Sequence, residues 1–283
     1  MVMFSVNARK INNICEIDSQ NVQGGNFANS IKSIRNVTKE KNGLIFVLGE
    51  ENIARDKMNI LAQQLPRVIR GKSLYPTLFL HEKAKNEFKN SIKCYQESLD
   101  VNKCDSTDEV VAQALFLAAR EQVNLSMGDV DLKSFRKIYI TGHGSVGLDY
   151  ILSGNSKITV KEIVDCLENN KILDNINDLR FTCCDSADRR KLDNLSKESI
   201  SVSNRSSGFF ESLFFGKSES FIEKISSEIW GRGYTDIRVS GYHGKGVFYT
   251  GDLPTSHLRS STIPATDAVK RKNVRVTLVS ELD

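Results

Sequence analysis

The sequence predicts an α/β fold with a mostly parallel central sheet, helices on its faces and an antiparallel β-flap at the C-terminus. Short apolar runs typical of buried strands alternate with longer segments whose apolar residues recur at helical spacing. Because parallel strands are joined by crossover connections, this alternation favours a parallel sheet. Residues 246–251 and 273–279 are strand-like, and a long turn with Pro254 and Pro264 separates them, which predicts a terminal β-hairpin.

In the first half of the chain, each predicted strand is followed by a helical segment. Glu50–Leu65 is expected to be a helix closed by Pro66, and Ser106 with Glu109 forms a capping box that opens a third helix. We expect strands at 43–49, 74–80 and 137–141, and helices at 50–65, 82–98 and 106–123.

The second half repeats the pattern and adds an insertion. Thr159 with Glu162, and Ser220 with Glu223, are capping boxes that predict helices over 159–167 and from 220 to the glycines at 231 and 233. Strands are expected at 178–184 and 236–240. Residues 188–218 are polar and predict a surface insertion, whose aromatic residues are either a partner patch or an anchor: Phe209, Phe210, Phe214 and Phe215.

The amino-acid composition limits the classes of protein to which this chain can belong. Lys and Arg number 39 against 35 Asp and Glu, so the formal net charge is +4, and 40% of the residues are hydrophobic. This balance is typical of a soluble globular protein and argues against a nucleic-acid partner held by overall charge. No apolar run reaches the roughly 18 to 20 residues of a membrane-spanning helix. The six cysteines have no CxxC spacing, which argues against a metal site and a disulfide framework.

The domain organisation follows from these patterns. Residues 1–30 have neither a helical nor an alternating period and are expected to form a flexible leader resembling a secretion signal. Residues 31–283 are expected to form one domain that includes the insertion 188–218 and the β-flap 241–283.

The sequence GHGSVG at 142–147 matches the dinucleotide fingerprint GxGxxG. A dinucleotide site requires a helix to begin at once, whereas the following LDYILSG is expected to be extended and the next helix begins near Thr159. The nucleotide interpretation is therefore disfavoured.

His143 within this sequence offers different chemistry. It lies at the end of one predicted strand, and Cys184 ends the next, so a parallel arrangement would bring them to the same edge of the sheet. An imidazole can deprotonate a nearby thiol and then protonate a leaving amine. Cys183 and Cys184 point to opposite faces of a strand, so one of them is expected to be reactive. The alternative is that both are structural and His143 is an ordinary turn residue.

The order of strand, GHG, amphipathic helix and strand ending in Cys is that of the caspase-like cysteine peptidases. FIEKISSEIWGRGYTDIRVSGYHGKGVFYTGD at 221–252 and KRKNVRVTLVSELD at 270–283 resemble the inositol-hexakisphosphate-activated cysteine protease domains of MARTX and large clostridial toxins. Similar domains occur as free-standing bacterial type III effectors. The resemblance covers about residues 43–283 in layout, and its close matches are GHG, the cysteine strand and the flap.

This resemblance implies a caspase-like fold and a peptidase site. It assigns His143 as general base and Cys184 as nucleophile, with Gly144 near the oxyanion, although TCCDSA departs from the small residues usual around the family's cysteine. It also makes Glu82, beside His81, a candidate for the carboxylate that orients the histidine.

The resemblance further implies inositol hexakisphosphate as an activator and no metal. Such a polyanion requires converging cations. The cations in matching places are Arg55, Lys57, Arg136, Lys137, Arg238, Lys245, Lys270, Arg271, Lys272 and Arg275. The implied protein is a monomer that is secreted into the host cytosol and cleaves a host protein there.

Two alternatives remain at the level of sequence. The same cations could serve a non-catalytic module that binds phosphoinositides or nucleic acid, and the same dyad could transfer an acyl group without hydrolysing a peptide. The substrate cannot be named, because spacing alone does not define a specificity pocket.

Overall fold

The computed structural model describes residues 43–93, 107–205, 218–247 and 256–281 as an α/β fold around a mostly parallel sheet of seven strands. The order of the strands is β12-β8-β7-β4-β1-β2-β3, and β12 alone is antiparallel to its neighbour. Their bounds are β1 Leu44–Val47, β2 Thr77–Phe79, β3 Asn124–Ser126, β4 Ile138–Thr141, β7 Asp178–Phe181, β8 Arg238–Tyr242 and β12 Arg275–Leu278. The predicted fold class is thereby confirmed.

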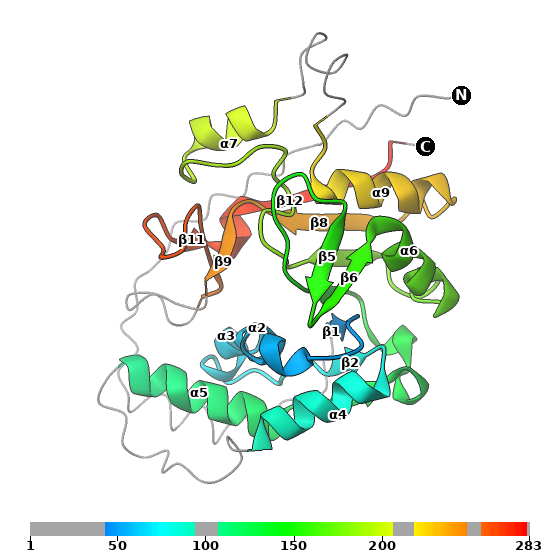
Figure 1. The fold of residues 1–283 in the computed structure, drawn as a ribbon, viewed down its shortest axis with the longest axis vertical. Helices are drawn as coiled ribbons and strands as arrows, with labels where there is room; N and C mark the ends of the chain where they lie inside the picture. Colours follow the sequence, from blue (N-terminus) through cyan, green and yellow to red (C-terminus); the bar gives the residue numbers. More distant parts are fainter. Residues whose placement is uncertain (1–42, 94–106, 206–217, 248–255, 282–283) are drawn as a thin grey trace.

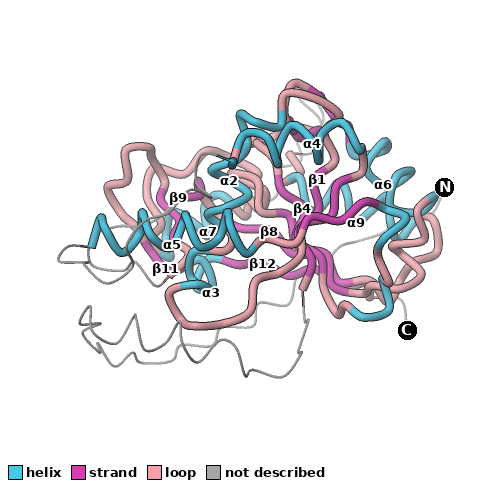
Figure 2. The backbone as a smooth tube through the Cα atoms, turned by 90° about the horizontal axis from the view of Figure 1, so that it is seen from below, coloured by secondary structure: helices cyan, strands magenta, loops and turns pink. Residues whose placement is uncertain are grey.

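Helices cover both faces of this sheet, which explains the continuous apolar runs in β1 and β4. Phe46 and Ile140 pack in one core with α6 (Val160–Asn169) and α9 (Phe221–Gly231). Val47 packs in a second core with the other group of helices, α2 (Lys57–Ala62), α3 (Leu65–Val68), α4 (Glu82–Ser91) and α5 (Thr107–Glu121). The two groups are visible in Figure 1, and Figure 2 shows the strands running between helices.

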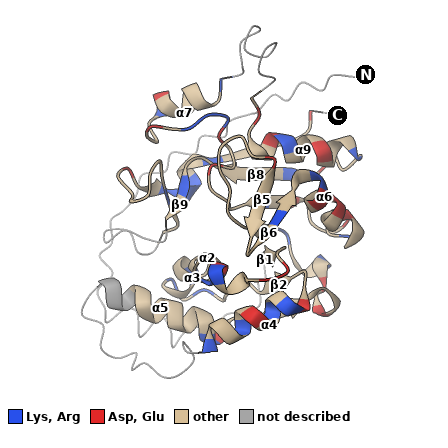
Figure 3. Cartoon of the chain, in the orientation of Figure 1, with Lys and Arg blue, Asp and Glu red and all other residues tan. Residues whose placement is uncertain are grey.

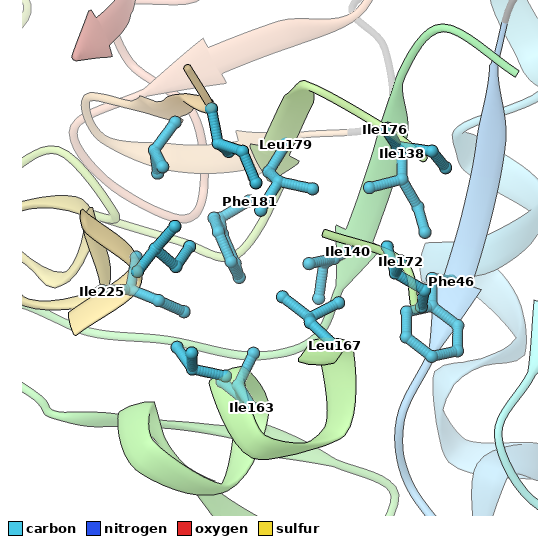
Figure 4. Packing of buried hydrophobic residues seen from close by; sticks show 14 of the residues in the cluster. Phe46, Ile138, Ile140, Ile163, Leu167, Ile172, Ile176, Leu179, Phe181 and Ile225 are labelled. Atoms are coloured by element: carbon cyan, nitrogen blue, oxygen red, sulfur yellow. The ribbon is translucent and has the colours of Figure 1, made fainter. Parts of the chain in front are cut away.

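The larger core gathers aliphatic and aromatic side chains from seven strands and from the helices α6 and α9. Phe181 and Phe221 meet edge to face, with ring centroids 5.2 Å apart. Figure 4 shows Ile163, Leu167 and Ile225 directed from α6 and α9 toward the side chains of the sheet. This packing fixes the sheet against the helices that join its strands.

Two helix starts follow the sequence prediction closely. The capping boxes of Thr159 with Glu162 and of Ser220 with Glu223 are both formed, and α6 and α9 begin directly after them. The box predicted at Ser106 and the end of the helix predicted over 82–98 lie partly outside the described residues.

The predicted single helix over 50–65 is wrong. The segment is divided into a 3₁₀ turn, η2 (Ile53–Asp56), then α2 and α3, and Pro66 lies in the first turn of α3 instead of closing a helix. Proline is tolerated there because a first-turn N–H has no partner within the helix. Strand β3 was not predicted, because its three residues are too few to establish a period.

The expected terminal hairpin is also wrong in its pairing. Residues 275–278 do form a strand, but β12 joins the central sheet beside β8, where Leu278 is buried. Separately, β9 (Lys245–Val247), β10 (Leu258–Ser260) and β11 (Val269–Lys270) form an antiparallel sheet, here called the flap sheet. A buried residue in the last strand favours the core over an exposed flap.

Residues after β4 are extended, as predicted, and form a hairpin of β5 (Tyr150–Ser153) and β6 (Ser156–Thr159). In the described part of the predicted surface insertion, Asp188 and Leu192 are buried, and α7 (Lys197–Ser203) follows. Its four phenylalanines and the 1–30 leader lie outside the described residues. In the part of the chain that is described, no helix is long and apolar enough to cross a membrane.

We predict that Ile225→Ala in α9 lowers the free energy of unfolding by about 2 to 5 kcal/mol, because it leaves a cavity in the larger core. Urea unfolding would measure the loss. Val202→Ala in α7 is a matched control, since Val202 is also β-branched and helical but 47% exposed, and its effect should stay within about 0.5 kcal/mol. Equal losses would contradict this description of the core.

Candidate active site

The turn after β4 presents His143 at the carboxyl end of the sheet. His143 exchanges two backbone hydrogen bonds with Leu152 of β5, with N to O distances of 2.7 and 2.9 Å. A Cβ on Gly142 would lie 2.9 Å from the Leu152 carbonyl oxygen, so the close approach requires glycine. The hairpin β5–β6 therefore holds the backbone of His143 in place.

The imidazole of His143 is paired with a buried carboxylate. Nε2 lies 2.9 Å from Oδ1 of Asp56, and the side chains are 50% and 6% exposed, respectively. Oδ2 of Asp56 accepts a 2.7 Å hydrogen bond from the N–H of Gly154, and the Asn59 amide nitrogen lies 3.1 Å from Nε2. A carboxylate only accepts, so Nε2 donates to Asp56 and Nδ1 is the basic nitrogen of the neutral ring.

Asp56 changes the protonation of the histidine. The hydrogen bond to Asp56 raises the pKa of His143, because it favours the imidazolium, while burial and the charge of Arg55 act in the opposite direction. A half-exposed histidine with this partner can accept a proton and remain oriented.

The sequence prediction that Glu82 orients the histidine is wrong. Glu82 hydrogen-bonds the hydroxyl of Ser126 and pairs with Lys85 at 2.8 Å, and His81 precedes the same helix, α4. The carboxylate instead follows β1, which is the direct neighbour of β4 in the sheet, whereas Glu82 follows β2. The spacing of residues along the sequence could not show that β1, and not β2, lies beside β4.

The two adjacent cysteines have different surroundings. Cys183 is 2% exposed within the larger core, and burial raises the pKa of its thiol to about 12. Cys184 is partly exposed. Cys184 is therefore the accessible thiol of the two. Both cysteines lie beyond Phe181, the last residue of β7, so the predicted strand over 178–184 is too long, and which thiol is reactive stays a prediction.

The structure brings the turn of His143 next to Cys184. β4 and β7 are parallel neighbours, and Thr182 continues their pairing with a 3.0 Å bond to the Ile140 carbonyl. A Cβ on Gly144 would lie 2.8 Å from the carbonyl oxygen of Cys184 and 3.1 Å from Cβ of Cys183. The segments that carry the imidazole and the thiol are thus in backbone contact. The role of Gly144 at an oxyanion stays a prediction.

A separate cavity of about 150 Å³ is rich in arginine. Arg67 stacks on Tyr75 at 3.7 Å from the ring centroid, and Tyr75 stacks on Tyr139 at 5.7 Å. Arg271 donates a 2.7 Å bond to Gln63 Oε1. The residues that line this arginine-rich cavity are Ile45, Gln63, Pro66, Arg67, Arg70, Lys72, Tyr75, Tyr139, His257 and Arg271.

The electrostatics of this cavity favour an anion. Burial, and next the charge of Arg271, hold the pKa of His257 well below its ordinary value. Arg259, Arg70 and Arg67 add to the repulsion. A neutral histidine among several cations indicates a strongly positive local potential.

The ten cations predicted for a single ligand lie on several elements (Figure 3), and whether they bind one ligand stays a prediction. Only Arg271 lines the arginine-rich cavity. Lys270 and Lys272 are the sequence neighbours of Arg271, and Lys57 is the first residue of α2.

The remaining predicted cations lie at other sites. Arg136, Lys137 and Arg238 line a cavity of about 610 Å³ at the amino ends of β4, β7 and β8, together with Asp174, Asp178 and Asp236. Burial lowers the pKa of Lys137, and the charges of Arg180, Arg67 and Arg275 add to this shift, so Lys137 also lies near Arg67 of the arginine-rich cavity. Arg55 donates to Asn155 at 2.8 Å beside His143, and Lys245 pairs with Asp185 at 3.1 Å, directly after Cys184.

The sequence prediction missed Arg67, Arg70 and Lys72. Their signal was the run RVIRGK at 67–72, which places three cations close together immediately after a proline. The run was not assigned to an element because the preceding helix was expected to end at Pro66. Within the described ranges, no cluster of three or more His, Cys, Asp or Glu could hold a metal ion.

We predict that Asp56→Asn lowers the pKa of His143, measured by NMR titration of the imidazole, because the hydrogen bond that favours the imidazolium is weakened. The raised pKa stabilises the folded protein below about pH 6.5, and this contribution is lost as the pH rises through the titration of folded His143. The stability advantage of the wild type should therefore shrink toward alkaline pH. Glu82→Gln is the control and should leave the titration unchanged. A shift in Glu82→Gln but not in Asp56→Asn would contradict the pairing.

No protein-family model and no curated protein sequence matches this chain. The chemistry of the site must therefore be argued from its own residues. These are an Asp–His pair on a turn in backbone contact with the segment of an accessible thiol, at the carboxyl end of a parallel sheet, and a separate cavity lined by arginines.

Proposed function

We propose that this protein is a cysteine peptidase in which Cys184 is the nucleophile, His143 the general base and Asp56 the carboxylate that orients His143. The observation that carries the proposal is the Asp56–His143 pair on a turn in backbone contact with Cys184. Nucleophile, base and orienting group then come from three neighbouring parallel strands, which is a rigid arrangement for covalent catalysis.

The proposed reaction has two steps. Nδ1 of His143 takes the proton of the Cys184 thiol, and the thiolate attacks the carbonyl carbon of the scissile peptide. Breakdown of the tetrahedral adduct breaks the C–N bond, and the imidazolium donates its proton to the leaving amine. Water then hydrolyses the acyl thioester with His143 again acting as base, which regenerates the thiol and releases the second product.

We further propose that inositol hexakisphosphate activates the enzyme by binding the arginine-rich cavity. Arg67, Arg70, Lys72 and Arg271 supply charge-assisted donors suited to phosphate, and the low pKa of His257 supports a positive potential there. This proposed site combines Arg271, which was predicted from the sequence, with Arg67, Arg70 and Lys72, which were not.

The flap sheet offers a physical connection between the two sites. Arg271, which follows β11, lies 5.2 Å from the ring centroid of Tyr242, and Arg259 on β10 lies 4.8 Å from the same ring. Arg259 in turn donates to the backbone carbonyls of Thr182 and Cys183. Ligand binding could thus order the segment that carries Cys184.

The proposed setting is the host cytosol, where inositol hexakisphosphate is abundant. The resemblance to free-standing type III effectors supports a secreted monomeric protein that cleaves a host protein. A polyanion-binding module is the second candidate, because the arginine-rich cavity alone would suffice for it. A cysteine-dependent acyltransferase would use the same pair of residues.

We predict that Cys184→Ala abolishes cleavage of a proteome-derived peptide library in the presence of inositol hexakisphosphate. Mass spectrometry would count the new N-termini. Cys183→Ser should retain cleavage, since Cys183 is buried and its pKa of about 12 keeps it protonated. Wild-type levels of cleavage by Cys184→Ala would exclude the peptidase mechanism, and an acyl thioester without hydrolysis would favour the transferase.

We predict that inositol hexakisphosphate raises the melting temperature of the wild type, because a ligand that binds only the folded state stabilises it by mass action. Arg70→Gln and Arg271→Gln should each weaken binding by about tenfold or more in titration calorimetry, since each removes a charged donor. Arg136→Gln and Arg238→Gln are matched controls in the other cavity and should change binding by about twofold at most. The reverse pattern would locate the ligand at the amino ends of the strands.

A further inference from the structure

Arg259 is a fully buried cation without a described anionic partner. Its side chain is among the largest that are wholly enclosed, with 2% of the residue exposed. The guanidinium donates to the carbonyl oxygens of Thr182 at 2.8 Å, Gly244 at 3.1 Å and Cys183 at 3.3 Å, and its Nε has no hydrogen-bond partner. Among the described residues, no Asp or Glu forms an ion pair with it.

Burial of an unpaired charge is costly, so its persistence requires an explanation. Carbonyl oxygens satisfy three donors but carry no net charge, and an ionised side chain away from water normally has a countercharge. Burial lowers the pKa of Arg259, and negative charge on Cys184 is the largest influence that opposes this shift. The two carbonyl groups of Thr182 and Cys183 directly precede Cys184, so the guanidinium lies beside the segment that carries this thiol.

We propose that Arg259 is a positioning residue that holds the Cys184 segment and supplies the countercharge for the Cys184 thiolate. The inference rests on the proposed role of Cys184 as nucleophile and adds how its reactive form is stabilised. A fixed cation close to a thiol increases the fraction present as thiolate, which is the nucleophilic form.

The hydrogen bonds of Arg259 also help to hold the backbone on both sides of Cys184. Its guanidinium binds the two residues before Cys184 and the carbonyl of Gly244. The N–H of Asp185, directly after Cys184, donates to the same Gly244 carbonyl at 2.8 Å. The residues before and after Cys184 are therefore both connected to the carbonyl of Gly244, the first through Arg259 and the second by a direct hydrogen bond.

Two other basic side chains near Cys184 have carboxylate partners. Lys245 is paired with Asp185, and His143 is paired with Asp56. Burial raises the pKa of the Cys183 thiol to about 12, so Cys183 stays neutral at physiological pH. Arg259 has no ion pair with a carboxylate of the described residues, although it lies near enough to Asp185 for its charge to oppose the larger effect of burial on the pKa of that carboxyl.

Two substitutions separate charge from hydrogen bonding. Arg259→Lys keeps the charge and loses the planar fork, whereas Arg259→Gln keeps an amide donor and loses the charge. The readout is the rate at which iodoacetamide alkylates Cys184 in the full chain at pH 7, with peptide fragmentation to distinguish Cys184 from Cys183. We expect Arg259→Gln to slow alkylation by about tenfold or more, and Arg259→Lys by about threefold at most.

Arg232→Gln serves as the control for a general loss of stability. Arg232 pairs with Asp165, Glu168 and Glu228 beyond α9, far along the chain from Cys184, and its replacement should leave the alkylation rate unchanged. Circular dichroism would establish that each variant is folded. Equal alkylation rates in folded Arg259→Gln and wild-type protein would overturn the proposal.

The alkylation rate is independent of proteolysis. Reactive Cys184 without peptide cleavage would therefore reject the peptidase function and leave this inference intact.

Discussion

The parallel pairing of β1, β4 and β7 is the constraint on which the candidate site depends. Val47 is opposite Thr141, and Ile140 is opposite Phe181, so the three strands end at nearly the same level. The segments that follow them carry Asp56, His143 and Cys184. A change of register by one residue would move every side chain of a strand to the other face and separate these groups. The two apolar cores that cover the sheet therefore also preserve the geometry of the site.

Buried charges fix the irregular segments at this edge through backbone groups. Asp56 accepts from the N–H of Gly154, and Arg259 donates to three carbonyls. Asp188, with no exposed surface, accepts from His243 at 2.6 Å and from the N–H of Gly244 at 2.8 Å. Each of these side chains satisfies backbone groups that a regular strand or helix would otherwise pair. The turns near Cys184 and the start of the flap sheet are thereby connected to one another.

Sequence patterns predicted the local features of this fold better than its spatial relationships. The strands that precede His143 and Cys184 were predicted, although β7 ends at Phe181 and not at Cys184. The capping boxes at Thr159 and Ser220 also depend on neighbouring residues and were predicted. Asp56 was missed because its role depends on which strand lies beside β4, and Arg67 because α3 brings it to a cavity shared with the distant Arg271. Pairing and register are set by tertiary packing, which one sequence does not reveal.

The positions of the charges restrict how a polyanion could activate the proposed enzyme. Arg271 repels Arg259, since its charge contributes to lowering the pKa of that residue, and both contact the ring of Tyr242. A polyanion in the arginine-rich cavity would reduce the positive potential that extends from Arg271 toward Cys184, which by charge alone disfavours the thiolate. Activation would therefore depend on how the ligand positions the residues near Cys184. If the ligand orders the flap sheet, the guanidinium of Arg259 is held against the carbonyls of Thr182 and Cys183. Geometry would then outweigh the unfavourable change in potential.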